Sequence, residues 1–151
     1  MMDINELKKQ INNKSRLIGV DMGTKRVGIS ISDENRKIAT PFKTINYENI
    51  QILIKEIDRM INENNISGII FGNPKNMDGT EGSSSQSVKD KIKLISKKIE
   101  IPLVLWDERL STVGAFNLSS ELDVNVTKRV KNIDKNAAAF ILQGALDFLN
   151  N

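Results

Sequence analysis

The spacing of apolar residues changes along this chain of 151 residues, and that change most constrains its fold. Three short apolar runs rich in β-branched residues come first, at 17–21, 27–32 and 37–45. The gaps between them suit hairpins, so we expect an antiparallel meander. From residue 50 the apolar residues recur at helical spacing, behind Asn49 as a capping residue, which predicts an amphipathic helix.

Strands and helices alternate in the rest of the chain. The pattern predicts strands at 68–72 and 101–106, helices at 88–99, from near 111, and at 133–149, and a polar, basic loop at 123–131. This alternation favours parallel pairing through right-handed crossovers. Three antiparallel strands joined to two parallel ones, with helices on both faces, form a ribonuclease H-like α/β fold. We expect that domain at 16–151, preceded by a helical extension at 1–15 in which Asp3 and Glu6 have capping-box spacing.

The chain contains no cysteine and no histidine. Disulfides, thiolate nucleophiles, Cys or His zinc sites and a Ser-His-Asp triad are therefore excluded. A site built from carboxylates prefers hard cations, so we expect Mg²⁺ or Mn²⁺ as the cofactor. The formal net charge of +3 and the pI near 9.1 favour a polyanionic partner.

Acidic residues stand where such a fold converges on one edge of its sheet. Asp21 ends the first strand, Asp107 and Glu108 follow the last strand, and Asp134 opens the final helix. Each alone is also typical of a turn or cap. A carboxylate cluster that binds two metal ions is suited to phosphodiester hydrolysis. Because successive strand residues face opposite ways, we expect Glu108 inside the site and Asp107 beside it.

The segment DMGTKR at 21–26 offers a second feature of this edge. Gly23 permits close approach of the backbone to a phosphate, and Lys25 and Arg26 supply positive charge. An ordinary hairpin with two solvated bases is the alternative. The pattern Asp-x-Gly-Thr also occurs in actin-like and sugar-kinase ATPases, but these need two such domains and this chain has room for one.

Four motifs in order resemble the YqgF (RuvX-like) family of pre-16S rRNA nucleases, also described as Holliday-junction resolvase-like. They are GVDMGTKRVG at 19–28, GNPKNMDGTEG at 72–82, DERLST at 107–112 and DKNAAAFILQGALD at 134–147. The resemblance implies that Asp21, Glu108 and Asp134 are metal-binding catalytic residues that act in 5′-end trimming of precursor 16S rRNA. The residues expected to contact substrate phosphates are Gly23, Lys25, Arg26, Arg109, Lys128 and Arg129. Asn73, Lys75 and Gly114 depart from the family pattern, and none of them is a proposed ligand.

Other functions remain open from the sequence. The same site would serve a Holliday-junction resolvase on four-way DNA, normally as a dimer, and the domain would also suit a non-catalytic RNA-binding module of ribosome assembly or an ATPase fragment. Trp106 ends an apolar strand, which favours a core position over base stacking. With neither a signal peptide nor a membrane span, we expect a cytoplasmic monomer or weak homodimer with nucleic acid as its partner and no membrane contact.

Overall fold

A computed structural model describes residues 2–11, 14–23, 25–73, 83–107 and 126–150, of which 73, 83–85 and 126–135 are described as backbone only. The elements are α1 (Ile4–Gln10), β1 (Arg16–Met22), β2 (Arg26–Ser32), β3 (Ala39–Asn46), α2 (Ile50–Asn64), β4 (Ile66–Asn73), α3 (Ser83–Ser96), β5 (Leu103–Asp107) and α5 (Val126–Leu149). None of the helices in these ranges is long and apolar enough to cross a membrane.

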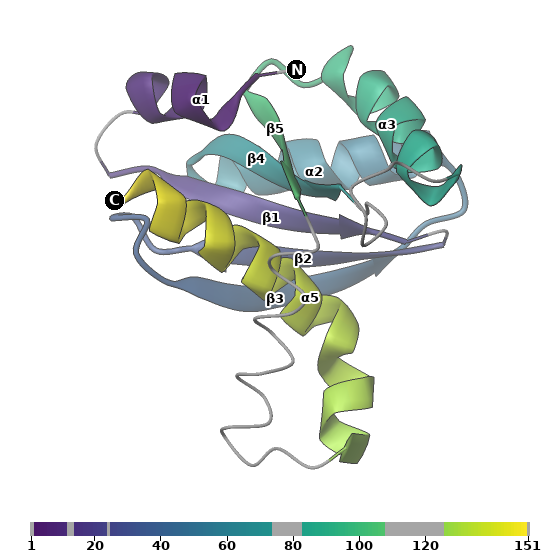
Figure 1. The fold of residues 1–151 in the computed structure, drawn as a ribbon. Helices are drawn as coiled ribbons and strands as arrows, with labels where there is room; N and C mark the ends of the chain where they lie inside the picture. The colour runs from purple at the N-terminus through teal and green to yellow at the C-terminus, as the bar shows by residue number, and fades with distance from the viewer. Residues whose placement is uncertain (1, 12–13, 24, 74–82, 108–125, 151) are drawn as a thin grey trace.

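The strands form one five-stranded sheet in the order β3-β2-β1-β4-β5 (Figure 1). The meander β1–β2–β3 is antiparallel, whereas β4 pairs with β1 and β5 pairs with β4 in parallel. The predicted mixed sheet with three antiparallel and two parallel strands is therefore confirmed.

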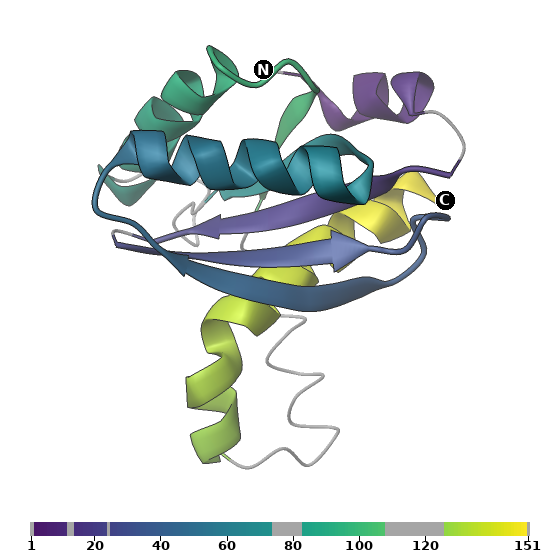
Figure 2. The same cartoon turned by 180° about the vertical axis from the view of Figure 1, so that it is seen from behind.

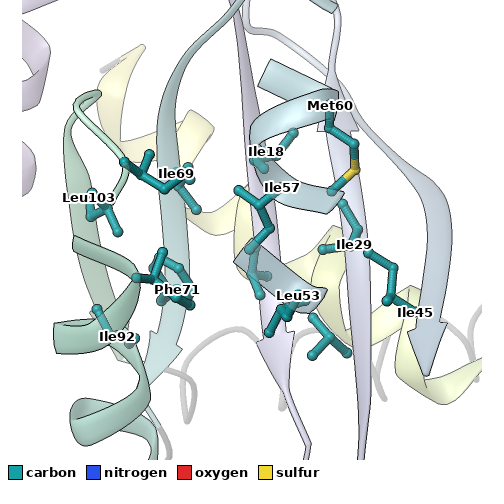
Figure 3. Close-up of a cluster of buried hydrophobic side chains, with 14 of the residues drawn as sticks. Ile18, Ile29, Ile45, Leu53, Ile57, Met60, Ile69, Phe71, Ile92 and Leu103 are labelled. Carbon is teal, nitrogen blue, oxygen red and sulfur yellow. The ribbon is translucent and has the colours of Figure 1, made fainter. Parts of the chain in front are cut away.

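Helices cover both faces of the sheet, so β1, β2, β4 and β5 bury side chains on both sides, whereas in the edge strand β3 only Ile45 is buried. Helix α5 crosses the face seen in Figure 1, and α2 and α3 cover the opposite face, seen in Figure 2. The larger core lies on the α2/α3 face, where Ile18, Ile29 and Phe71 pack beneath α2 and α3 (Figure 3). The smaller core lies on the α5 face and contains Leu7, Leu17, Ile70, Val104, Ile141, Leu142, Ala145 and Leu146.

The N-terminal segment packs on the α5 face, beside strand β5. Asp3 caps α1 by accepting a hydrogen bond from Asn5 N at 2.8 Å, and Leu7 is fully buried in the smaller core. Met2 N donates to Leu103 O at 3.0 Å, which adds one parallel bridge to the edge of β5. The helix predicted within the extension at 1–15 is present as Ile4–Gln10.

Helix α5 begins earlier in the chain than the sequence pattern predicts. The loop predicted at 123–131 is wrong from Val126 onward, because α5 already begins there. Asp134 consequently lies about two turns inside the helix rather than at its start. The spacing of Val126, Val130 and Ile133 is helical, but the polar and basic residues between them hid that signal. The helix predicted from near residue 111 lies outside the described residues.

Candidate active site at the carboxyl end of β1

Asp21 lies near the end of β1 and belongs to the α5 face. Leu17 is buried in the smaller core on that face, and a Cβ placed on Gly19 would touch α5. Because alternate strand residues share a face, Asp21 follows them on the same side of the sheet. Its side chain is partly exposed. The strand therefore presents this carboxylate at the carboxyl end of β1, on the face that α5 covers.

The strands on either side of Asp21 place glycines next to it. Asp21 is directly opposite Gly28 of β2. On the other side, the parallel register pairs Val20 with Phe71, so the next residue, Gly72, is beside Asp21. Gly72 in turn pairs with Trp106 of β5. We call Gly28, Asp21, Gly72 and Trp106 the glycine row. Neither neighbouring strand puts a side chain against Asp21 on this row.

Helix α5 approaches β1 and β2 very closely. The Ser30 hydroxyl donates to the Ala138 carbonyl at 2.7 Å, across the two layers. A Cβ added at Gly19 would lie 2.7 Å from Leu142 Cβ and 2.8 Å from Ala138 O. The height of the helix above β1 is therefore set by a glycine and a serine on the sheet.

The direction of α5 brings its N-terminal part toward the Asp21 end of β1. Near the other end, the Gln143 amide donates to Lys37 O at 3.0 Å and accepts from Ala39 N at 2.8 Å, where β3 begins. Helix α5 is therefore antiparallel to β1. Gln143 lies near the start of β1, at Leu17, Ala138 lies near Gly19, and the chain before Ala138 leads toward Asp21. The backbone of Asp134 lies one turn beyond Ala138 on this path.

The hairpin after Asp21 is held by hydrogen bonds from three elements. Gly23 N donates to Arg26 O at 2.8 Å, and a Cβ on Gly23 would stand 2.5 Å from that oxygen, so only glycine fits the turn. Tyr47 donates twice, from its hydroxyl to Gly23 O and from its amide to Lys25 O, both at 3.0 Å. Lys91 of α3 donates to the Tyr47 hydroxyl at 2.9 Å. Lys25 and Arg26 are exposed.

Tyr47 was not identified from the sequence as part of the site. It is a single tyrosine placed just after a strand, and nothing in its spacing indicates which loop its hydroxyl reaches. Its two hydrogen bonds depend on the hairpin between β1 and β2 closing against the end of β3. That contact follows from the register of the meander and carries no local signal.

The other predicted site residues are described to different extents. Asp107 is the last residue of β5 and alternates with Leu103 and Leu105, which pack against the larger core, so it belongs to the α2/α3 face rather than that of Asp21. Lys128 and Arg129 lie in the first turns of α5, described as backbone. Glu108 and Arg109 lie outside the described residues. Within the described ranges no three acidic side chains gather into a metal-binding group.

Trp106 lies on the α5 face of β5 and is partly buried. It packs against the smaller core and meets Phe148 of α5 edge to face, with ring centroids 5.9 Å apart and planes at 64°. Phe148 is itself 41% exposed. The expected core position of Trp106 is therefore only partly correct, because the indole sits at the rim of the core.

The whole domain matches one sequence family. The profile of a family described as RuvX, Holliday junction resolvase, matches residues 15–148. The chain belongs to the RuvX family. A relative in Pelagibacter ubique, named "Putative pre-16S rRNA nuclease", is 64% identical over 151 residues and covers all of both chains. A relative of the same name in Rhodobacter capsulatus is 42% identical over 133 residues, covering 88% of this chain and 84% of the relative.

Solved structures similar to this RuvX-family chain share its fold at low identity. RuvC of T. thermophilus in complex with a Holliday junction substrate superposes with a TM-score of 0.56 at 6% identity, covering 89% of this chain and 96% of that one. The yeast mitochondrial Holliday junction resolvase Ydc2 gives 0.54 at 12% identity, covering 97% and 84%. The predicted ribonuclease H-like fold and the assignment as a nuclease, which acts on nucleic acid, are confirmed.

Proposed function

We propose that this RuvX-family nuclease matures the 5′ end of precursor 16S rRNA by metal-dependent hydrolysis at the carboxyl end of β1. The observation that carries the proposal is the position of Asp21, a carboxylate flanked on its row by two glycines and facing α5. Relatives that span the full chain carry the name of a pre-16S rRNA nuclease, which supports this substrate. Such a substrate is met in the cytoplasm.

Three carboxylates would hold Mg²⁺ or Mn²⁺, namely Asp21, Glu108 and Asp134. The oxygen-only donor set suits a hard cation. Glu108 is favoured over Asp107, since Val104 and Trp106 belong to the α5 face and the next residue in that alternation is 108. When bound, such ions activate the attacking water and stabilise the leaving oxygen.

The remaining residues of the proposed site bind and orient the substrate. Tyr47 fixes the hairpin that carries the exposed Lys25 and Arg26, which would neutralise phosphates. Arg109, Lys128 and Arg129 would extend this positive surface on the other elements of the site. Residues 1–15 are assigned to an N-terminal helical extension.

Resolution of four-way DNA junctions is the second candidate function. The family description and the two solved resolvases of the same fold favour it. The same carboxylates would act on DNA, and a two-fold symmetric dimer would be required to cut two strands in a coordinated way. Substrate choice, rather than the residues of the site, separates the two candidates.

The experiment compares a labelled precursor 16S 5′-end RNA with a synthetic four-way DNA junction. Each is incubated with Mg²⁺, Mn²⁺ or EDTA and with the parent protein, Asp21→Asn or Asp58→Asn. Asp58 is an exposed carboxylate of α2, so Asp58→Asn makes the same chemical change away from the site. We expect metal-dependent cleavage of RNA that Asp21→Asn lowers more than about a hundredfold, because even outer partners of metal ligands are worth 10–100-fold.

Each other outcome has a definite meaning. Cleavage of the junction alone, lost in Asp21→Asn, would select the resolvase. Cleavage that persists in Asp21→Asn would exclude Asp21 as a ligand. Binding of RNA without cleavage under any metal condition would favour the non-catalytic assembly module.

A further inference from the structure

We propose that a row of lysines on α3 binds the phosphate backbone of the substrate strand outside the cleavage site. The row, called the lysine ridge, consists of Lys89, Lys93 and Lys97. This inference deepens the proposed function and rests on it in taking nucleic acid as the substrate. It adds a binding surface on the side of the sheet that α2 and α3 cover.

One short segment carries as much net positive charge as the whole chain. Residues 89–100 contain five lysines and two acids, a net charge of +3, and the formal net charge of all 151 residues is also +3. The other residues together are therefore neutral. Such a local excess of charge attracts a polyanion far more strongly than the average charge of the chain does.

The lysines of the ridge follow one another at helical spacing. Lys89 and Lys93 are four residues apart on α3, so they share one side of the helix, about 6 Å apart along its axis. Lys97 follows after four more residues, in the turn that ends the helix. A stacked nucleic-acid strand carries one charge about every 3.4 Å, so the ridge spans about four phosphates of one strand.

Two lysines of the ridge are open to solvent. Lys93 and Lys97 are exposed, and their ammonium groups take part in no ion pair or hydrogen bond within the described ranges. Like charges one turn apart destabilise a helix, although the helix dipole offsets part of that cost near the carboxyl end of α3. A phosphate backbone would supply the opposite charge along the whole ridge.

A groove runs beside the ridge, between α3 and the edge strand β5. Its volume is about 460 Å³, and the residues that line it include Lys89, Lys93 and Leu105, with Glu100 beyond the helix. Leu105 lies in the last half of β5, the strand whose carboxyl end leads to Glu108 of the proposed site. A strand that leaves the site past the end of β5 would therefore enter a groove with lysines on one wall.

Helix α3 reaches the level of the proposed site. Lys91, between the first two lysines of the ridge, donates to the Tyr47 hydroxyl at 2.9 Å, and that hydroxyl donates to Gly23 O at 3.0 Å. Gly23 is two residues after Asp21. From this level α3 runs toward the start of β5 (Figure 1). The ridge would therefore bind nucleotides that flank the cleaved bond, and not the bond itself.

The test neutralises the two exposed lysines of the ridge, Lys93→Gln and Lys97→Gln together. The control pair, Lys9→Gln and Lys55→Gln, removes the same charge from exposed lysines of α1 and α2. Both pairs are made with Asp21→Asn, which keeps the RNA intact. Anisotropy measures binding, over a series of salt concentrations, of precursor 16S RNAs with about 15 nucleotides or about 3 nucleotides on each side of the cleaved bond, about 50 Å or 10 Å of strand.

We expect the ridge pair to weaken binding of the long RNA and the control pair to leave it nearly unchanged. Each lost phosphate contact lowers the slope of log K against log salt by about 0.7, so two lower it by about 1.4 and weaken binding about 25-fold near 0.1 M salt. The short RNA should bind equally to the ridge pair and the control pair. A single-stranded DNA of the long sequence should show the same loss, because the ridge reads phosphate charge alone.

Three outcomes would overturn the inference. An unchanged salt slope in the ridge pair would leave the groove to a partner other than nucleic acid. An equal loss in both pairs would mean that total charge, rather than the ridge, attracts RNA. A lower melting temperature of the ridge pair with unchanged binding would assign these lysines to the stability of α3.

Cleavage separates this inference from the proposed function. In proteins that retain Asp21, the ridge pair should raise KM for the long RNA and leave kcat unchanged. Cleavage that persists in Asp21→Asn would sink the proposed function, whereas the salt slopes would still decide the ridge. Equal KM values for the ridge and control pairs, with cleavage lost in Asp21→Asn, would sink only the ridge.

Discussion

Replacing Gly19 with alanine would place a methyl group in the contact between β1 and α5. The new Cβ would lie 2.5 Å from Ser30 Oγ, 2.7 Å from Leu142 Cβ and 2.8 Å from Ala138 O. The serine hydroxyl can rotate away, but it then loses its hydrogen bond to Ala138. The other two atoms are fixed to the helix. To restore contacts of about 3.5 Å, α5 must move away from the sheet by about 0.7 Å.

The size of the effect follows from these contacts. Overpacking of a dense core raises the free energy of the folded state by about 1–3 kcal/mol, and loss of the Ser30 hydrogen bond adds about 1 kcal/mol. A stiffer unfolded chain offsets about 0.4–1 kcal/mol. We therefore expect Gly19→Ala to lower the free energy of unfolding by about 1–3.6 kcal/mol. For a chain of this length, that lowers Tm by about 2–14 °C.

Gly68→Ala is the matched control on the neighbouring strand. Its Cβ would meet Leu17 Cδ2 at 2.9 Å and Leu7 Cδ1 at 3.2 Å. Both are the ends of flexible side chains, so they can move at a cost below about 1 kcal/mol. Urea denaturation and thermal melting measure the loss of stability in each variant. They compare a clash with the fixed helix α5 in Gly19→Ala with a clash against movable side chains in Gly68→Ala.

Nuclease activity gives an independent measurement of the same displacement. Well below both melting temperatures, Gly19→Ala should lose more activity than Gly68→Ala, since α5 carries Asp134, one of the proposed metal ligands. Equal stability of the two variants would refute the reasoning, because it would mean that α5 yields as easily as a leucine side chain. Equal activity with unequal stability would show that the height of α5 does not matter for the reaction.

Two further predictions concern the hairpins. Tyr47→Phe removes the hydroxyl that donates to Gly23 O while keeping the ring beside Lys91. We expect KM to rise and the free energy of unfolding to fall by about 0.5–1.5 kcal/mol. An unchanged KM would count against a substrate role for this hairpin. The main-chain amide of Ile38, together with its neighbours, lowers the pKa of Asp33 below 3.8, so this carboxylate stabilises the fold above pH 3.8 and the benefit fades as pH falls through the lowered pKa. In urea denaturation from pH 7 to pH 3, Asp33→Asn should have a lower free energy of unfolding than the parent protein at neutral pH, and this difference should shrink in acid. A difference that stays constant with pH would contradict the prediction.

The fold was largely predictable because most elements carry a local signal. The meander shows in alternating apolar runs with short gaps, and α2 shows in its apolar spacing and in Asn49, whose side chain accepts from Ile52 N at 3.0 Å. The start of α5 was missed because its first turns are polar and basic. That composition suggested a loop, although the apolar residues between have helical spacing.

The arrangement around Asp21 was predictable only in part. The acid itself stands at a strand end, but the glycines beside it come from β2 and β4, which are far apart in the chain. The alignment of Gly72 depends on the register of the parallel strands β1 and β4, and a slip of one residue would turn Gly72 to the other face. No local pattern specifies that register. The same reason hid the position of Trp106 across from Asp21.

The place of α5 in the chain has a consequence for folding during synthesis. This helix is the last element, yet it packs on β1, β2 and β3, which are made first. The meander can form early from contacts close in sequence, whereas the contact of Ser30 with Ala138 spans 108 residues. The α5 face of the first strands must wait for the synthesis of α5. A nascent chain that ends before α5 therefore holds Asp21 without the helix that carries Asp134, and under the proposed function it would be inactive.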